Sequence, residues 1–367
     1  MCAASETVGE LQAMEVDTSW PEFPVVLREA VGARAGAKLF AGLGSAGASW
    51  YALDADTPAA IWQQCADFPG AVPSGAACAA TDAHVFVFGG VISAPDSACL
   101  QQSDAIWRYD IARDHWEQLS LLCPVGFLGA SACRINTTRL WIVGGYNRSQ
   151  LDAFFRQQQM LDDAGRKALL HQYMDRPVED FGWNPQIWEL DTQALTLKAV
   201  AAFPQTARCG AGLIHASEHL WYVSGESKPG LRDPLISSFS IRDGVPEMQA
   251  AACLPAAQEG MLQEGVAAAF AGAYGGMPVV AGGPNFPGAA ECYRAGQHYA
   301  HAGLRKSWRR EIYIYRNQQW HKIGNLPAGR AHGLMFELAQ GLLLVGGDTQ
   351  DGAPVRSSWL LSFQWND

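Results

Sequence analysis

A short apolar strand that ends in glycine recurs along the chain, and this repeat limits the possible folds more than any other feature of the sequence. Its six copies are KLFAGLG (38–44), HVFVFGG (84–90), LWIVGG (140–145), LWYVSGE (220–226), MPVVAGG (277–283) and LLLVGG (342–347). A variable loop and a second strand follow each copy: WYALD (50–54), IWRYD (106–110), IWELD (187–191), LISSFSI (235–241), EIYIYR (311–316) and SWLLSF (358–363). The spacing brackets the ~50-residue period of kelch repeats.

The repeat predicts an all-β fold, a six-bladed kelch-type β-propeller in which each repeat forms one four-stranded sheet. The 38 Gly, 19 Pro and 13 Trp residues favour short strands with tight turns over a helix bundle. Trp62, Trp116 and Trp320 occupy the same place in their repeats, so we interpret them as packing anchors between blades. A single repetitive domain would explain a chain of 367 residues.

The last repeat ends at Asp367, soon after its third strand, so it lacks a fourth strand of its own. Residues 20–32 resemble the linker at 320–333, which suggests that the N-terminal part of the chain supplies the missing outer strand. Such a closure would remove an exposed sheet edge. We therefore divide the chain into an N-terminal extension (1–18) and a single propeller domain (19–367).

The longest interval between repeats contains residues 149–183, which have helical periodicity and charged turns. We interpret this segment as a helical insertion in the third repeat. Loops on one face of a propeller surround the mouth of its central channel, and a long ordered loop there more often serves a site than stability.

Charge and composition argue against several functions. The formal net charge is −10, which makes nucleic acid an unfavourable partner, although a few cations in one cleft could still bind a small anion. The nine cysteines form no CxxC pair, which argues against a disulfide scaffold or a zinc ribbon. His298 and His301 form an HxxH pair without a third ligand nearby, so we predict no metal site.

The sequence also predicts no membrane span. Its longest uncharged run, 265–283, is rich in Gly and Ala and is interrupted by Pro278, which suits two strands better than a bilayer helix. The first 20 residues are acidic and lack the basic and apolar regions of a secretory signal. We therefore expect a cytoplasmic location.

Neighbouring sequence features make two residues candidates for a role in catalysis or ligand binding. Glu226 ends the fourth copy of the repeat, where the other copies end in glycine, and sequence rules tend to fail at functional sites. The alternative is a surface glutamate that tolerates the turn. Arg232 follows on a loop with Pro229 and Gly230; its guanidinium could bind a carboxylate bidentately, or it could be an ordinary solvated arginine.

Several longer motifs carry a family resemblance. They are GLGSAGASWYALD (42–54), GGYN (144–147), SGESKPGLR (224–232), GGPNFPG (282–288), HYAHAGLRKSW (298–308) and GRAHG (329–333). With these motifs the chain resembles, nearly end to end, the sialic acid mutarotases, which are kelch propellers also called N-acetylneuraminate epimerases. Members usually carry a secretory signal and act in the periplasm, and they tend to have an arginine after the proline of VPSGAAC (72–78), where this chain has none.

The resemblance implies an isomerase that interconverts the α and β anomers of N-acetylneuraminate by opening and reclosing the sugar ring, without a cofactor. The proton-accepting glutamate of the family falls on Glu226, and Arg232 would anchor the carboxylate of the sugar acid. On its position alone, Arg330 begins the inner strand of the last repeat, where it could bind a carboxylate or hydroxyl of a ligand or bond to neighbouring backbone. Asn147, Lys228, Asn285 and Tyr299 are further loop candidates for substrate binding. Two alternatives stay open: a non-catalytic kelch module that binds a sialylated glycan or a protein partner, and a mutarotase for a different sugar acid. The sequence predicts no oligomeric state.

Overall fold

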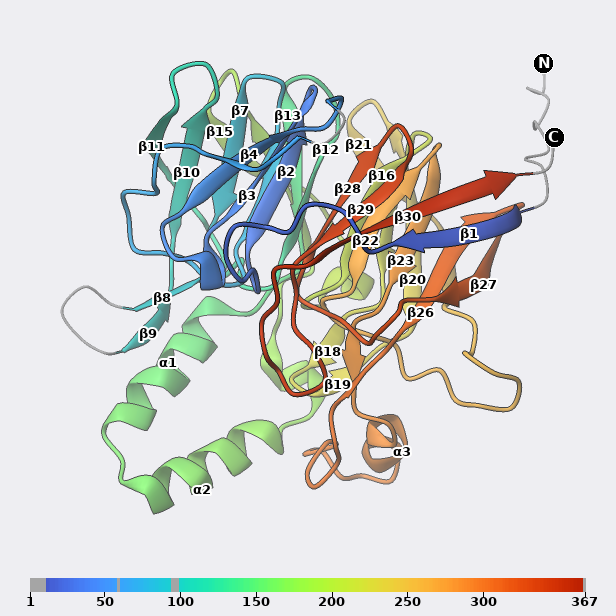
Figure 1. Cartoon of the computed structure of the whole chain (residues 1–367). Helices are drawn as coiled ribbons and strands as arrows, with labels where there is room; N and C mark the ends of the chain where they lie inside the picture. Colours follow the sequence, from blue (N-terminus) through green and yellow to red (C-terminus); the bar gives the residue numbers. More distant parts are fainter. Residues whose placement is uncertain (1–10, 58–59, 94–98, 366–367) are drawn as a thin grey trace.

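A computed structural model describes residues 11–57, 60–93 and 99–365, and it contains six antiparallel four-stranded sheets, or blades (Figure 1). Blade 1 consists of β2 (Val31–Ala35), β3 (Lys38–Gly42), β4 (Trp50–Asp54) and β5 (Gln63–Gln64). Blade 2 consists of β6 (Ala77–Ala80), β7 (His84–Phe88), β10 (Ala105–Asp110) and β11 (His115–Leu122). Blade 3 consists of β12 (Ser131–Arg134), β13 (Arg139–Val143), β14 (Gln186–Asp191) and β15 (Thr196–Ala202). Blade 4 consists of β16 (Gly212–Ala216), β17 (His219–Val223), β20 (Leu235–Arg242) and β21 (Val245–Cys253). Blade 5 consists of β22 (Phe270–Tyr274), β23 (Met277–Ala281), β26 (Glu311–Arg316) and β27 (Gln319–Asn325). Blade 6 consists of β28 (Leu334–Leu338), β29 (Gly341–Val345), β30 (Ser358–Trp365) and β1 (Leu11–Asp17).

The first strand of each blade lies innermost. These six strands contact one another in a closed cycle, β2 to β6, β12, β16, β22, β28 and back to β2. The glycine-ending strand of the repeat is the second strand of each blade, and the strand that follows the variable loop is the third. The predicted all-β, six-bladed propeller is therefore confirmed.

Blade 6 closes the propeller with both ends of the chain. β1 pairs antiparallel with β30, with Met14 opposite Phe363, so an N-terminal strand does complete the last blade, as expected (Figure 1). The closing strand, however, lies inside the segment 1–18 that we assigned to an extension. The propeller therefore includes residues before 19, because the outer edge of β30 is covered by residues 11–17. Residues 1–10 of that segment lie outside the described part of the chain.

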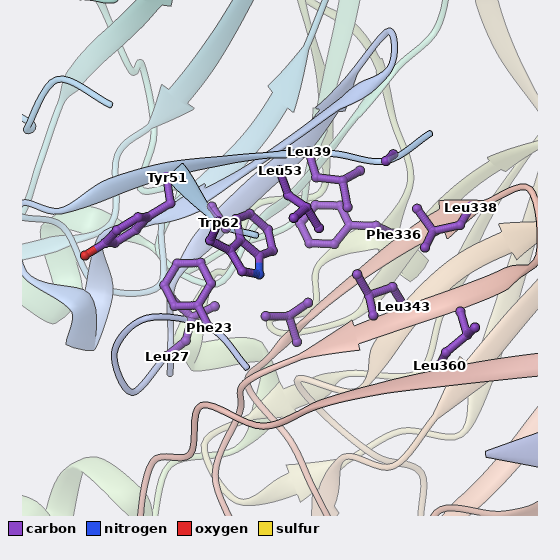
Figure 2. Close-up of a cluster of buried hydrophobic side chains, with 13 residues drawn as sticks. Phe23, Leu27, Leu39, Tyr51, Leu53, Trp62, Phe336, Leu338, Leu343 and Leu360 are labelled. Carbon is purple, nitrogen blue, oxygen red and sulfur yellow. The ribbon is translucent and has the colours of Figure 1, made fainter. Parts of the chain in front are cut away.

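Aromatic and aliphatic side chains fill the spaces between neighbouring blades. Figure 2 shows the cluster between blades 1 and 6, where Trp62 lies 4.9 Å from Phe23 and 6.5 Å from Phe336, measured between ring centroids. Trp116 packs in the same way between blades 1 and 2, and Trp320 between blades 4 and 5. Burial of one large apolar side chain stabilises a fold by about 2 kcal/mol, so these three tryptophans do serve as packing anchors.

Additional elements lie in the connections between second and third strands, and they gather on one face of the propeller (Figure 1). They are η1 (Gly44–Ala46), the hairpin β8 (Val91–Ser93) and β9 (Leu100–Gln102), α1 (Arg148–Gln159), α2 (Asp163–Met174), η2 (Val178–Phe181), the hairpin β18 (Glu226–Lys228) and β19 (Leu231–Arg232), and the group β24 (Pro284–Asn285), α3 (Ala289–Arg294) and β25 (Ser307–Trp308). A further short helix, η3 (Pro204–Thr206), joins blades 3 and 4.

The helical insertion predicted in the third repeat is present as α1, α2 and η2. Asn147 and Asp162 cap the two α-helices, each accepting a hydrogen bond from a backbone N–H of the first turn. Among the described residues, no helix combines the length and the apolar character that a membrane crossing would require.

Candidate active site

A ring of backbone hydrogen bonds surrounds the axis of the propeller on the face that carries the insertions. In every blade, the residue two positions before the inner strand has a positive φ. Its backbone N–H donates to the carbonyl of the equivalent residue in an adjacent blade, with N–O distances of 2.7–3.2 Å. The six members, which we call the backbone ring, are Glu29, Gly75, Gly129, Gly210, Ala268 and His332, with φ between 46° and 66°. Glycine adopts this conformation readily, so the three other residues are kept there at a conformational cost.

The backbone ring lines a cavity of about 680 Å³ that receives residues from all six blades. This volume lies within the range usual for small-molecule sites, roughly 300–1,000 Å³. The ionisable side chains in the lining are Glu29, Tyr146, Cys209, Glu226, Arg232 and His332. The cavity can therefore accept a small polar ligand and offers it both acidic and basic side chains.

Glu226 and Arg232 face each other across the hairpin formed by β18 and β19. Oε1 of Glu226 lies 2.6 Å from Nη1 of Arg232, and the two side chains are 15% and 6% exposed. Oε1 also accepts the backbone N–H of Gly230 at 3.2 Å. Gly230 has a φ of 84°, and a Cβ there would lie 1.8 Å from Nδ1 of His301, so only glycine fits this turn.

Arg232 is held from a second side. Its Nε donates to the carbonyl of Pro284 at 3.2 Å, and its guanidinium carbon lies 4.9 Å from the ring centroid of Phe286. A guanidinium has five N–H donors in a fixed fork, and these contacts use only part of them. Arg232 can thus position Glu226 and still bind an anionic group of a ligand.

The local reason for selecting Glu226 from the sequence was wrong. Ser224 and Gly225 have φ values of 57° and 103°, and they occupy the turn that Gly144 and Gly145 form in blade 3. Ser224 is therefore the residue that replaces glycine. Its hydroxyl donates to the carbonyl of Asp233 at 2.7 Å and accepts the N–H of Val266 at 2.8 Å, which stabilises the turn.

Glu226 instead follows that turn, in a position that the repeat uses in other blades as well. Its backbone pairs with Cys209, just as Val91 pairs with Ser74 and Asp348 with Ala331. In each case the residue after the turn forms a backbone bridge with the residue directly before the member of the backbone ring in the same blade. This position, rather than a missing glycine, brings the carboxylate of Glu226 to the cavity.

Two of the other sequence candidates fix the helical insertion. Asn147 caps α1 and donates from Nδ2 to the carbonyl of Gly182 at 3.0 Å. Lys228 is buried, and its Nζ donates to the carbonyls of Met174 (2.8 Å), His298 (2.6 Å) and Arg176. Burial lowers the pKa of Lys228 to about 8. Neither residue lines the cavity, and backbone groups engage both side chains.

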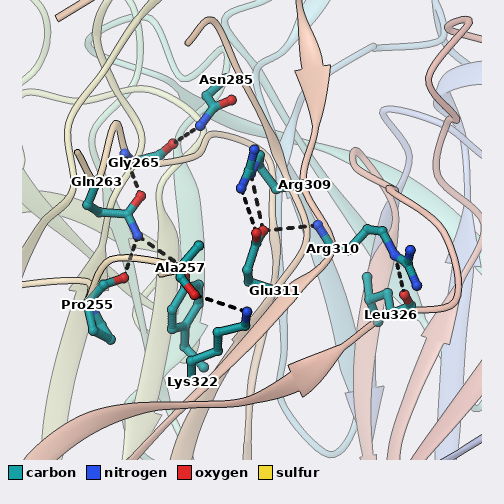
Figure 3. A network of polar contacts seen from close by, with 11 residues as sticks. Pro255, Ala257, Gln263, Gly265, Asn285, Arg309, Arg310, Glu311, Lys322 and Leu326 are labelled. Carbon is teal, nitrogen blue, oxygen red and sulfur yellow. Dashed lines mark hydrogen bonds and ion pairs between the residues drawn. The ribbon is translucent and has the colours of Figure 1, made fainter. Parts of the chain in front are cut away.

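The remaining three candidates also lie outside the cavity lining. Nδ2 of the buried Asn285 donates to the carbonyl of Gly265 at 3.1 Å (Figure 3). The ring of Tyr299 packs 5.0 Å from that of His301 and 5.4 Å from that of His171. Arg330 stacks 3.4 Å from the ring centroid of Trp359 and donates to the carbonyl and hydroxyl of Ser357, and burial lowers its pKa to about 10. Contacts with other parts of the protein, in the insertions as well as in blade 6, thus account for these three side chains.

Three further residues with ionisable side chains line the cavity and were not among the sequence candidates: Glu29, Tyr146 and His332. Glu29 and His332 could have been found by aligning the starts of the inner strands, because glycine stands at the same place in blades 2, 3 and 4. Burial raises the pKa of Tyr146 well above its usual range, so its phenol keeps its proton and can donate to a ligand. No group of three or more His, Cys, Asp and Glu side chains suited to a metal ion occurs in the part of the chain that the structure describes.

Fold and site together define a class: a six-bladed β-propeller with a central pocket that is lined by a largely buried carboxylate–guanidinium pair. Comparison with known proteins places the chain within this class. Residues 20–367 match the family described as N-acetylneuraminate epimerase, and the chain belongs to that family.

Individual relatives agree with this assignment. An N-acetylneuraminate epimerase of Brucella melitensis is 36% identical over 370 residues, covering 99% of this chain and 94% of the relative. One of Vibrio cholerae is 33% identical over 355 residues, covering 95% and 92%. Among solved structures, that of YjhT superposes with a TM-score of 0.87 at 28% identity, covering 94% of this chain and 99% of the other.

Proposed function

We propose that this protein interconverts the α and β anomers of N-acetylneuraminate. The observation that carries the proposal is the Glu226–Arg232 pair, a largely buried carboxylate and guanidinium facing a cavity of suitable size. Membership of the N-acetylneuraminate epimerase family and the names of relatives that are 33–36% identical support the choice of substrate.

The chemistry needs one group that accepts a proton and one that donates a proton. Opening the pyranose ring transfers the proton of the anomeric hydroxyl to a base and delivers a proton to the ring oxygen while the bond from that oxygen to the anomeric carbon breaks. Reclosure on the other face of the carbonyl reverses both transfers. Glu226 accepts the hydroxyl proton in the first step and returns it in the second, and the reaction requires no cofactor.

Arg232 provides the orientation. A substrate carboxylate bound to its free N–H groups holds the anomeric carbon, to which that carboxylate is attached, beside Glu226. The open-chain intermediate can then rotate about its carbon–carbon bonds without leaving the cavity. Because a catalyst leaves the equilibrium ratio of the anomers unchanged, the protein accelerates the exchange in both directions.

Proton NMR of freshly released α-N-acetylneuraminate tests the proposal. The wild-type protein should speed the appearance of the β anomer over the rate in buffer and should leave the final ratio unchanged. Binding without acceleration would assign the cavity to a non-catalytic sialic acid module. Absence of both, with the protein folded, would refute this substrate and direct the search to another sugar acid.

A further inference from the structure

We propose that His332, oriented by Asp348, is the second proton-transfer residue of this site. The inference rests on the proposed anomer exchange, and it names the group that exchanges protons with the ring oxygen while Glu226 serves the anomeric hydroxyl. His332 lines the same cavity as Glu226 and Arg232.

Asp348 fixes the imidazole ring. Its Oδ1 lies 3.0 Å from Nδ1 of His332 and accepts Nε1–H of Trp308 at 2.8 Å. Asp348 is only 3% exposed. Burial acts to raise the pKa of Asp348, but the hydrogen bonds from His332 and Trp308 outweigh it and lower that pKa, so the group is a carboxylate. A carboxylate at Nδ1 holds the proton on that nitrogen and leaves Nε2 to exchange protons with a ligand.

Asp348 occupies the same position in its repeat as Glu226 does in the fourth repeat. Asp348 pairs through its backbone with Ala331 in blade 6, in the same way that Glu226 pairs with Cys209 in blade 4. The two blades are separated only by blade 5, and His332 is the member of the backbone ring that follows Ala331. The propeller thus brings two acid–base groups to one cavity from different sides.

His332 also occupies an unfavourable backbone position. Its φ is 56°, whereas glycine fills the equivalent position in blades 2, 3 and 4. A non-glycine residue in this conformation costs about 1 kcal/mol. Glycine would complete the same backbone hydrogen bonds at a lower cost, so the geometry of the backbone ring does not account for the imidazole.

Glu226 and His332 together are sufficient for every proton transfer that the reaction needs. In ring opening, Glu226 takes the proton of the anomeric hydroxyl, the bond between ring oxygen and anomeric carbon breaks, and protonated His332 gives its Nε2 proton to that oxygen. In ring closure, neutral His332 takes the proton back from the attacking hydroxyl, and Glu226 returns its proton to the former carbonyl oxygen. Both residues end in their starting states.

Glu29 is the competing candidate, because it also belongs to the backbone ring and lines the cavity. Its Oε2 accepts a hydrogen bond from the hydroxyl of Ser74 at 2.5 Å, which engages one carboxylate oxygen. A second carboxylate would also repel an anionic sugar acid, whereas a protonated imidazole attracts it. These differences favour His332.

His332→Asn is the first test. Asparagine tolerates a positive φ and can donate an amide N–H to Asp348, but it cannot transfer a proton. We expect a folded variant that binds N-acetylneuraminate and whose anomer exchange, followed by NMR, is slower by about 100-fold or more. An active His332→Asn would overturn the inference while leaving the proposed function intact. Loss of exchange in Glu29→Gln alone would assign the role to Glu29.

His332→Gly with added imidazole separates chemistry from packing. Glycine relaxes the backbone and leaves space beside Asp348, so imidazole should restore part of the exchange rate in proportion to its concentration. Asn317→Gly, at a turn residue with a φ of 48° between β26 and β27, is the matched control and should keep full activity. A folded His332→Gly that is fully active, or inactive and not rescued, contradicts the proposal.

Asp348→Asn tests the positioning role. It should lower kcat with little effect on KM, and ¹⁵N NMR of the ring nitrogens should show His332 losing its single tautomer. An unchanged tautomer together with an unchanged kcat would exclude Asp348 as the orienting group. If wild-type protein fails to accelerate exchange at all, the proposed function itself fails, which distinguishes that outcome from failure of this inference.

Discussion

Oε1 of Glu226 and Nη1 of Arg232 lie 2.6 Å apart in a site where both side chains are largely shielded from water. Each group is therefore the main charge partner of the other. Removing one partner of such a pair leaves an uncompensated charge, whereas replacing both can be nearly neutral. The pair acts on the substrate in the proposed reaction, and it also constrains which substitutions the hairpin tolerates.

Arg232→Met should destabilise the protein by about 3 kcal/mol, because it leaves the Glu226 carboxylate buried and unpaired. The double variant Glu226→Gln with Arg232→Met should recover part of this loss. Urea denaturation measures both. Arg108→Met is the control: it breaks an ion pair with Glu117, whose side chain is 53% exposed, and should cost only about 0.5 kcal/mol. Equal losses at the two sites would contradict the account.

Gly230→Ala should disrupt the hairpin and reduce anomer exchange. Its Cβ would lie 1.8 Å from Nδ1 of His301, and the movement needed to avoid this contact removes the bond between the Gly230 N–H and Glu226. Gly260→Ala offers a close control, since its φ is 78° and nothing lies within 4 Å of the added Cβ. The control should lose about 1 kcal/mol of stability and no activity. Full activity in Gly230→Ala would show that the hairpin geometry is not required.

Glu311→Gln should make the stability of the protein less sensitive to pH in the acidic range. Burial acts to raise the pKa of Glu311, but the hydrogen bonds from Arg309, drawn in Figure 3, outweigh it and lower that pKa. A carboxyl group with a lowered folded-state pKa contributes stability above its unfolded pKa and loses this contribution as pH falls. Melting temperatures between pH 3 and 6 should therefore fall less in the variant than in wild type. An equal fall in both proteins would show that this pair does not respond to acid.

Lys228→Met should loosen the insertion without removing a group from the cavity. Three backbone carbonyls, from Met174, Arg176 and His298, would lose their shared donor. Buried acceptors without partners cost about 1–3 kcal/mol each, so α2 should become more accessible to proteolysis. Limited trypsin digestion, with cleavage sites located by mass spectrometry, measures this effect. A wild-type digestion pattern would show that Lys228 does not anchor α2.

The architecture was predictable because a propeller repeats its local rules. The glycine-ending strands, the aromatic third strands and the unfinished last repeat each indicated a structural feature that is present. The boundary at residue 19 was wrong, because the closing strand at Leu11–Asp17 pairs with a strand near the other end of the chain. Nothing local in those residues indicates that partner.

The site was only partly predictable, and for a physical reason. Glu226 and Arg232 line the cavity, but Glu226 reaches it from a position after the turn and does not replace a glycine. Lys228 and Arg330 were further candidates for substrate binding, yet backbone groups distant in sequence bind their side chains. Such contacts depend on the finished fold. His332 could be recognised only once the starts of the inner strands were aligned.

The central claim is that Glu226 transfers the proton of the anomeric hydroxyl. It is tested most directly by NMR of α-N-acetylneuraminate with wild type, Glu226→Gln and the surface control Glu259→Gln, together with a binding measurement for each. The account predicts that wild type and the control accelerate conversion to the β anomer, while Glu226→Gln binds the sugar but leaves its conversion at the buffer rate. Acceleration by Glu226→Gln equal to that of wild type would contradict the account.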